Sequence, residues 1–90
     1  MGYAEKVYVA LQNGETKIEI YVSKMEGGYM AVMVPVASGD ARLRSLFKGH
    51  KIPQEIGTTI EFVIAACETW IKKNLGQDVV VFEKKVTGAT

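Results

Sequence analysis

The sequence contains one cysteine, one histidine and no long apolar run, and each shortage excludes a class of protein. Cys67 stands alone, so the chain cannot form an internal disulfide. No apolar run approaches the roughly 20 residues that a bilayer-spanning helix needs. The N-terminus lacks a basic segment followed by an apolar one, which is the pattern of a signal peptide. We therefore expect a cytoplasmic protein without a membrane segment.

The chain has no large excess of charge of one sign. It carries 11 basic and 10 acidic residues, for a formal net charge of +1. This balance argues against binding to nucleic acid through overall charge, although a local basic patch is compatible with it. With 48% hydrophobic and 23% charged residues, the composition is that of a folded globular domain. We expect one domain over residues 1–90, with an ordered core over about 5–86 and a disordered tail over 87–90.

The chain offers few groups for catalysis or metal binding. Cys67 falls on the apolar stripe of a predicted helix, where a free thiol is usually an inert core side chain. His50 lies beside Lys51 in a predicted loop, where we expect a solvated side chain. The sequence shows no metal-ligand spacing, no phosphate-binding glycine motif and no carboxylates paired for acid–base chemistry. It predicts a protein that is not an enzyme and that binds no metal or cofactor.

The strongest local signal is a helix over residues 58–76. Thr58 and Glu61 form a capping-box pattern at its start, and Gly76 can take the left-handed conformation that ends a helix. Apolar residues recur between these ends at helical spacing, which predicts one buried stripe. The stripe consists of Ile60, Val63, Ile64, Cys67, Ile71 and Leu75. We expect this helix to pack along one face of a sheet.

Alternating apolar and polar residues predict a first strand over residues 6–12 and a second over 16–25. Asn13-Gly14 between them suits a type I′ turn, because both positions tolerate positive φ. The turn predicts three facing pairs: Leu11 with Thr16, Val9 with Ile18, and Val7 with Ile20. In this register, apolar residues meet on the face toward the helix.

A second turn at residues 26–28 leads to a third strand, which we expect to end at Pro35 or to lie at an edge there, because proline has no amide hydrogen. A two-residue loop would pair Val22 with Met33, whereas a three-residue loop with a glycine bulge would pair Val22 with Val32. We favour the three-residue loop, because it adds apolar side chains to the face that the helix covers. These side chains are Met30, Val32 and Val34.

The second half of the chain predicts two elements besides the long helix. Residues 40–48 fit a short helix, and residues 51–57 fit a loop because Pro53 disfavours helix before it. Residues 78–86 predict a last strand, whose apolar run at 79–82 indicates burial on both faces. The predicted fold is α+β: an antiparallel β-meander of three strands, a short helix, a long helix packed on one sheet face, and a C-terminal fourth strand.

The predicted register leaves an apolar and aromatic surface on the far side of the sheet. It is formed by Tyr8, Ala10, Tyr21, Ala31 and Met33, with Val80 or Phe82 beside them. A surface of this kind usually contacts another molecule, and a homodimer would also cover the second face of the last strand. The candidate interface residues are Tyr8, Tyr21, Met33, Val80 and Phe82. We therefore expect a small interaction domain that forms a homodimer or binds a protein partner.

Two other functions are alternatives. A basic segment without acidic residues could contact phosphates, and its side chains are Arg42, Arg44, Lys48, His50 and Lys51. Together with exposed tyrosines that stack bases, it would make a nucleic-acid-binding module, although a solvated basic helix explains the same pattern. The other alternative is a small-molecule pocket between the long helix and the sheet, near Trp70. A homodimer or protein partner is favoured over nucleic acid.

Two short segments resemble the HicB-like antitoxin domain. Residues 26–31, Glu-Gly-Gly-Tyr-Met-Ala, followed by Pro35, resemble the acidic-Gly-Tyr hairpin of that family. Residues 57–61, Gly-Thr-Thr-Ile-Glu, resemble its lead into the helix after the sheet, and the order of strands and helix is also similar. The Leu-Pro-Gly-Cys stretch of the family is missing, and no DNA-binding segment follows Val86. The resemblance implies a non-catalytic domain that binds a protein partner.

Overall fold

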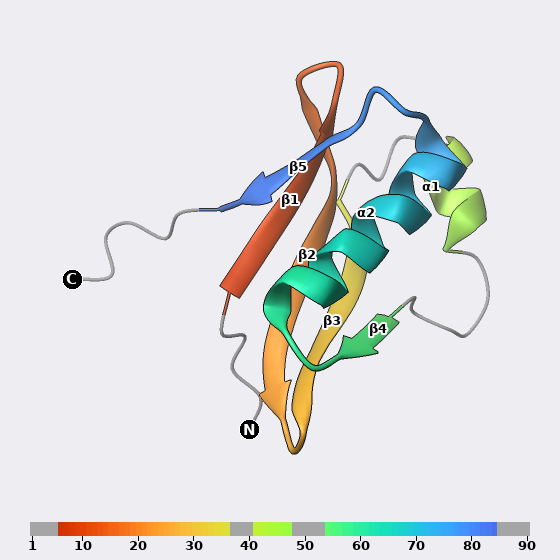
Figure 1. The fold of residues 1–90 in the computed structure, drawn as a ribbon. Coiled ribbons are helices and arrows are strands. Elements are labelled where there is room, and N and C mark those ends of the chain that lie inside the picture. Colours follow the sequence, from red (N-terminus) through yellow and green to blue (C-terminus); the bar gives the residue numbers. More distant parts are fainter. Residues whose placement is uncertain (1–5, 37–40, 48–53, 85–90) are drawn as a thin grey trace.

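The computed structural model describes residues 6–36, 41–47 and 54–84, which form one antiparallel sheet and two helices (Figure 1). The elements in chain order are β1 (Lys6–Gln12), β2 (Glu15–Met25), β3 (Gly28–Pro35), α1 (Ala41–Leu46), β4 (Gln54–Gly57), α2 (Ile60–Leu75) and β5 (Val80–Glu83). The strands lie in the order β4-β3-β2-β1-β5. The α+β class, the short helix and the long helix on one sheet face are confirmed. The predicted tail and the outer limits of the ordered core lie outside the described residues.

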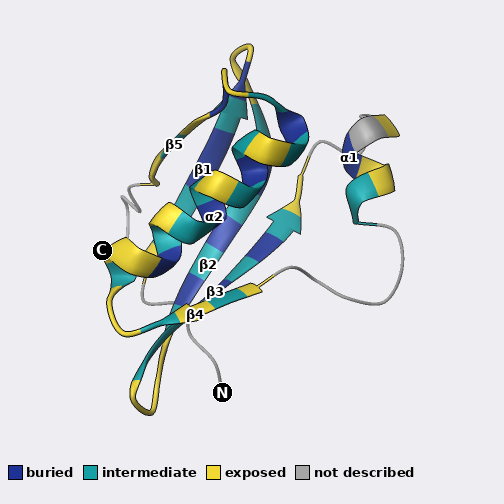
Figure 2. Ribbon diagram, turned by 45° about the vertical axis from the view of Figure 1, so that its right-hand side comes forward, coloured by how far each residue is buried: buried dark blue, intermediate teal, exposed yellow. Residues whose placement is uncertain are grey.

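One face of the sheet, which we call the inner face, packs against α2 (Figure 2). The buried side chains of α2 are Val63, Cys67, Ile71 and Leu75, all members of the predicted stripe. The core also contains Ala10, Ile18, Ile20, Val22, Ala31, Met33, Leu43 and Val79. Because Leu43 belongs to α1, both helices contribute to the core on the inner side. Neither described helix covers the opposite side of the sheet, which we call the outer face.

The turn of the first hairpin forms as predicted. Asn13 and Gly14 have φ angles of 56° and 76°, both in the left-handed region that a type I′ turn requires. Directly beyond the turn, Leu11 pairs with Thr16, which confirms the first predicted pair. The two turn residues therefore fix the pairing at this end of the hairpin.

The pairing shifts by one residue beyond Leu11, because β2 contains an extra residue, Lys17, at a β-bulge. The predicted pairs Val9–Ile18 and Val7–Ile20 are wrong and are replaced by Ala10–Ile18 and Tyr8–Ile20. A shift of one residue turns every side chain of a strand to the other face. The inward residues of β1 are consequently Tyr8, Ala10 and Gln12, and the outward residues are Val7, Val9 and Leu11.

Neither pairing considered for the second hairpin is correct, because Val22 pairs with Ala31, and the favoured three-residue loop is replaced by a two-residue loop. The loop is Glu26-Gly27, closed by the pair Met25–Gly28. Gly27 has a φ of 86°, where glycine alone is free of steric cost. The observed pairing differs by one residue from the favoured three-residue loop, so the side chains of β3 are turned over. Tyr29, Ala31 and Met33 point inward, and Met30, Val32 and Val34 point outward.

The sizes of the inward side chains explain why this register is preferred. Ala10 and Ala31 are fully buried in the core beneath α2. Their short side chains leave room for the larger apolar side chains of the helix. In the predicted register, valines would occupy the inner face of β1 and β3 and would hold the helix farther from the sheet. Close packing of α2 therefore favours the alanines on the inner face and the valines on the outer face.

The two edges of the sheet also differ from the prediction. Gln54–Gly57, expected to be part of a loop, forms β4 beside β3. The C-terminal strand, β5, begins at Val80 rather than at residue 78 and lies beside β1. Burial on both of its faces is wrong, because Val80 is 58% exposed and Phe82 is 46% exposed. Their side chains lie at an edge, on the face that no described helix covers.

The ends of α2 agree with the prediction to within one residue. The N-cap is Thr59, not Thr58, and its side-chain oxygen accepts a hydrogen bond from the Phe62 amide at 3.1 Å. At the other end, the amide of Gly76 donates to the carbonyl of Lys72 at 3.0 Å. Gly76 is therefore confirmed as the residue at which the helix ends.

Gln12 joins the end of β1 to the end of α2. Its side chain is buried, and its Nε2 donates to the Leu75 carbonyl at 3.0 Å and to Asp78 Oδ1 at 2.8 Å. Carbonyls in the last turn of a helix have no partner within the helix. The side chain of Gln12, on β1, supplies a hydrogen-bond donor for one of these carbonyls and thereby links the end of α2 to the sheet.

We expect Gln12→Ala to lower the free energy of unfolding by about 1–3 kcal/mol, because the substitution removes two hydrogen bonds in a buried setting. Gln54→Ala removes the same side chain from an exposed position and is expected to change that free energy by no more than about 0.5 kcal/mol. Urea unfolding of both variants measures the difference. Equal effects would contradict the role assigned to Gln12.

Candidate interaction surface

The outer face of the sheet presents one apolar surface that spans several strands. Facing residues of neighbouring strands lie on the same side of a sheet, so the pairing arranges side chains in rows across it. One row contains Val34, Glu19, Val9 and Phe82, from β3, β2, β1 and β5. The row beside it contains Val32, Tyr21 and Val7. We define the outer patch as Val7, Val9, Leu11, Met30, Val32, Val34, Val80 and Phe82.

The outer patch is a second apolar cluster, separate from the core under α2. Val9 is only 7% exposed, yet it is not part of the core cluster on the inner side. Val9 is therefore buried on the outer face, apart from the core beneath α2. Exposure is greatest toward the edges, where Val80 and Phe82 lie on β5 and Ile56 lies on β4 opposite Met30. These exposed apolar side chains on a face that neither described helix covers make the outer patch the candidate interaction surface.

The polar side chains at the centre of the outer face bind one another. The Tyr21 hydroxyl donates to Glu19 Oε1 at 2.5 Å, and Lys84 Nζ donates to Glu19 Oε2 at 3.4 Å. Both carboxylate oxygens of Glu19 are therefore occupied within the chain. A surface whose polar groups already have partners can be covered by an apolar partner at little cost in lost hydrogen bonds.

The same contacts shift two pKa values in opposite directions. The hydrogen bond from Tyr21 lowers the pKa of Glu19 below its usual 4.5. Burial opposes this shift, and the hydrogen bond and positive charge of Lys84 lower the pKa further. The bond to Glu19 raises the pKa of the Tyr21 hydroxyl above its usual 10, with burial acting in the same direction. Around neutral pH, Glu19 is thus charged and Tyr21 is a neutral donor.

The structure divides the predicted interface residues between the two faces. Tyr21, Val80 and Phe82 lie on the outer face, as expected. Tyr8 and Met33 were assigned to the wrong face: Met33 is fully buried in the core, and Tyr8 packs against that core. The cause is the one-residue difference in register on both sides of β2.

Sequence reasoning missed most of the outer patch. It placed Val7, Val9, Val32 and Val34 under the helix. The valines at every second position predicted strands with an apolar face. The residues between them are also largely apolar, so alternation alone cannot tell which of the two faces the helix covers. The short side chains of Ala10 and Ala31 were the available signal, because they mark the face on which the helix can approach the sheet most closely.

The predicted basic segment is described only in part. Arg44 lies in α1 with an exposed side chain. The side chain of Arg42 lies outside the described residues, as do Lys48, His50 and Lys51. Anion binding by this segment therefore stays a prediction.

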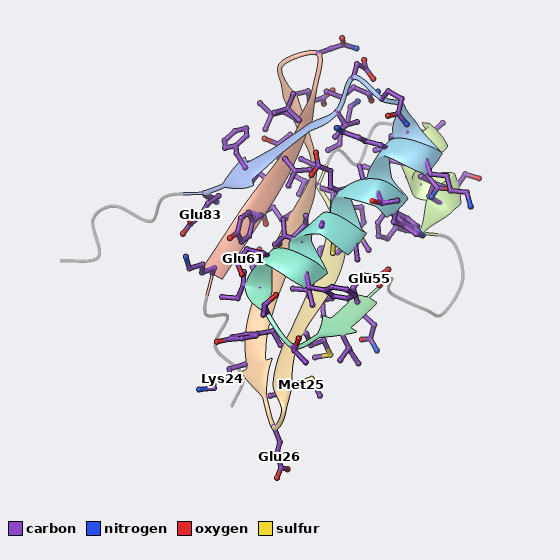
Figure 3. All side chains as sticks on the ribbon, viewed as in Figure 1. Lys24, Met25, Glu26, Glu55, Glu61 and Glu83 are labelled. Atoms are coloured by element: carbon purple, nitrogen blue, oxygen red, sulfur yellow. The ribbon has the colours of Figure 1, made fainter. Side chains whose placement is uncertain are left out.

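Cys67 has the properties of an inert core thiol. It is fully buried on α2, and burial raises its pKa to about 12, with the negative charge of Glu55 as a smaller cause. Glu55 lies on β4 (Figure 3). A thiol with such a pKa carries almost no thiolate near neutral pH, and thiolate is the reactive form. Cys67 is thus unsuited to act as a nucleophile.

Trp70 packs against Phe47, the residue that follows α1. Its ring meets Phe47 edge to face, with centroids 6.0 Å apart and planes at 72°. A hollow of about 370 Å³ lies at the start of α2, away from the predicted pocket site near Trp70, and is lined by Tyr29 and residues 58–61. The tip of the β2–β3 hairpin, with Lys24, Met25 and Glu26, extends beyond this end of the helix (Figure 3).

Comparison of the chain with protein-family models, with curated proteins and with solved structures finds no match. The resemblance to the HicB-like antitoxin domain therefore stays a prediction.

Within residues 6–36, 41–47 and 54–84, no three side chains are grouped so that they could hold a metal ion. In the same part of the chain, no helix combines the length and apolar character needed to span a bilayer.

We expect Tyr21→Phe to raise the pKa of Glu19 toward its usual value, because the substitution removes the main cause of the shift. Stabilisation by charged Glu19 is present above pH 4.5 and is lost as the pH falls through its lowered folded-state pKa. NMR titration of the Glu19 carboxyl carbon measures the change. Tyr8→Phe is the control and should leave that pKa unchanged, and an equal effect of both variants would contradict the assignment.

We expect Cys67 to resist a thiol reagent such as Ellman's reagent at pH 8 in the folded protein. The reagent should react at the rate at which the protein unfolds, and quickly in denaturant. A rate in buffer close to that of a free thiol would show that Cys67 is accessible.

Proposed function

We propose that this chain is a small, non-catalytic interaction domain that forms a homodimer by packing the outer faces of two sheets together. The observation that supports this proposal is the outer patch, an apolar surface that neither described helix covers. The fold already buries one face of the sheet with α2. A second copy would bury the other face and complete a layered structure, with each sheet between a helix layer and its partner sheet.

The size of the outer face fits a dimer. Five strands about 4.8 Å apart, with about six residues each at about 3.3 Å per residue, give a flat area of roughly 480 Å². Two facing copies would cover roughly 1,000 Å² in projection, and accessible area is larger because side chains are not flat. Stable interfaces bury about 1,200–2,000 Å² in total. The available surface is therefore large enough for a specific dimer.

The charges of the outer face favour a second copy over nucleic acid. Glu19 lies at the centre of this face, and a carboxylate there would repel a phosphate backbone. Glu19 is already paired with Lys84 within the chain, so a second copy can cover this face without leaving either charge unpaired. The resemblance to the HicB-like domain implies a non-catalytic, protein-binding role, which agrees with this proposal.

We expect the wild-type chain to sediment as a dimer at micromolar to high micromolar concentration. Phe82→Glu should weaken the dimer at least about tenfold, because it places a charge within the apolar contact. The matched control is Phe62→Glu, since Phe62 is 59% exposed but belongs to α2, which lies against the inner face. Sedimentation equilibrium gives the dissociation constants.

A strictly monomeric wild type at high micromolar concentration would overturn the proposal. Equal weakening by both substitutions would also count against it, because the contact would then not be confined to the outer face. Circular dichroism spectra that match the wild type establish that each variant is folded.

A further inference from the structure

We infer that β5 is a releasable strand, which detaches from the edge of the sheet while the rest of the fold stays intact, and that the contact of Lys84 with Glu19 holds it in place. We call this contact the latch. The inference concerns a single chain and goes beyond the proposed dimer. It bears on the outer patch, because Val80 and Phe82 lie on β5 and leave the patch when the strand detaches.

β5 is the strand with the weakest attachment to the fold. It lies at one end of the sheet and, within the described residues, pairs with β1 alone, over four residues (Figure 1). Val81 packs against the core, whereas Val80, Phe82 and Glu83 are exposed. β4, at the other edge, is equally short but contacts α2 as well as β3. A strand with few buried contacts opens at a low cost in free energy, so β5 is expected to open first.

The chain before β5 is anchored, which places the hinge of the movement at one point. Val79, directly before the strand, is buried in the core. The side chain of Asp78 accepts the hydrogen bond from Gln12, and the Val79 amide donates to the Gly76 carbonyl at 3.4 Å. The chain therefore stays in place as far as Val79, and the released segment begins with β5.

Lys84, the residue after β5, connects this strand to the middle of the sheet. Its amide donates to the Val7 carbonyl at 2.7 Å and so extends the pairing with β1 by one residue. Its side chain reaches across β1 to β2, where Nζ lies 3.4 Å from Glu19 Oε2. The ion pair between Lys6 and Glu83, at 3.7 Å, joins β5 only to its neighbour β1. The latch is thus a contact that ties β5 to a strand beyond its neighbour.

The latch is strong enough to favour the closed strand and weak enough to open. The Glu19 side chain is only 21% exposed and is held by the Tyr21 hydroxyl, so the acceptor is in position for the lysine. The Lys84 side chain itself is half-exposed. A pair with an exposed partner changes an equilibrium by only a few fold. Loss of the lysine charge should therefore raise the population of the open strand while the sheet stays folded.

Hydrogen exchange with residue resolution tests the release of β5. The samples must be dilute enough to sediment as monomers, so that contacts between copies cannot hold the strand. The amides to follow are those of Phe82 and Lys84, because bonding residues alternate along an antiparallel pair and Lys84 bonds to β1. We expect their protection factors to be at least tenfold lower than that of Ile20, which lies in the core on β2.

Urea distinguishes local release from unfolding of the whole chain. Opening of β5 exposes little surface, so low urea concentrations should hardly change exchange at Phe82, whereas exchange at Ile20 should become faster. Equal protection of both amides, with equal dependence on urea, would overturn the release of β5.

Two lysine substitutions test the latch. Lys84→Met should lower the protection of the Phe82 amide about two- to fivefold. The matched control is Lys72→Met, which removes a lysine from an ion pair with Glu68 on α2, at 3.0 Å. It destabilises the closed and the open strand equally, so Phe82 should keep its protection and only exchange through complete unfolding, as at Ile20, should become faster. An unchanged Phe82 amide in Lys84→Met, or an equal effect of both substitutions on it, would overturn the latch.

Discussion

The position of one extra residue in β2 decides which side chains lie under the helix. Lys17 forms a bulge beside the first turn, and from there the pairing of β1 with β2 is shifted by one residue. The shift turns Ala10 toward α2 and Val9 away from it. The two-residue loop of the second hairpin sets the register of β3 in the same way and turns Ala31 toward α2. The close packing of α2, the composition of the core and the character of the outer face all follow from this register.

A sheet with two apolar faces has two surfaces to bury, and the helices in the described part of this chain lie on only one of them. The inner face is closed by α2 and by Leu43 of α1. On the outer face Val9 is buried, while Val80 and Phe82 are exposed at the edge. At its centre, Glu19 is held by Tyr21 and Lys84. We propose that a second copy of the chain covers this surface, because its own outer face is also apolar.

Much of the local structure could be predicted from the sequence. Asn13-Gly14 set the first turn and its nearest pair, and Gly76 marked the end of the long helix. The α+β class followed from the strand and helix periodicities together. β4 was missed because Gln54–Gly57 is four residues long, has no alternation and follows a proline.

The candidate surface could be predicted only in part, because its position depends on the register. Residue alternation showed that β1 and β3 each have a valine face, but the bulge at Lys17 has no distinct sequence signal. Tyr21 was placed correctly, since β2 keeps Ile18 and Ile20 inward in either register. Val80 and Phe82 also lie on the expected face, where they pair with Leu11 and Val9 of β1. The expectation that the far side of the sheet is apolar was right, although Tyr8 and Met33 turned out to belong to the core.

The most direct measurement of the central claim is an isotope-filtered NOE experiment on a mixture of labelled and unlabelled chains, which detects contacts between copies only. The account predicts intermolecular NOEs to methyl groups of the outer face, such as those of Val9 and Val34, and none to Val63 on the buried side of α2. Intermolecular NOEs from the helices alone, or none at all at high micromolar concentration, would contradict it.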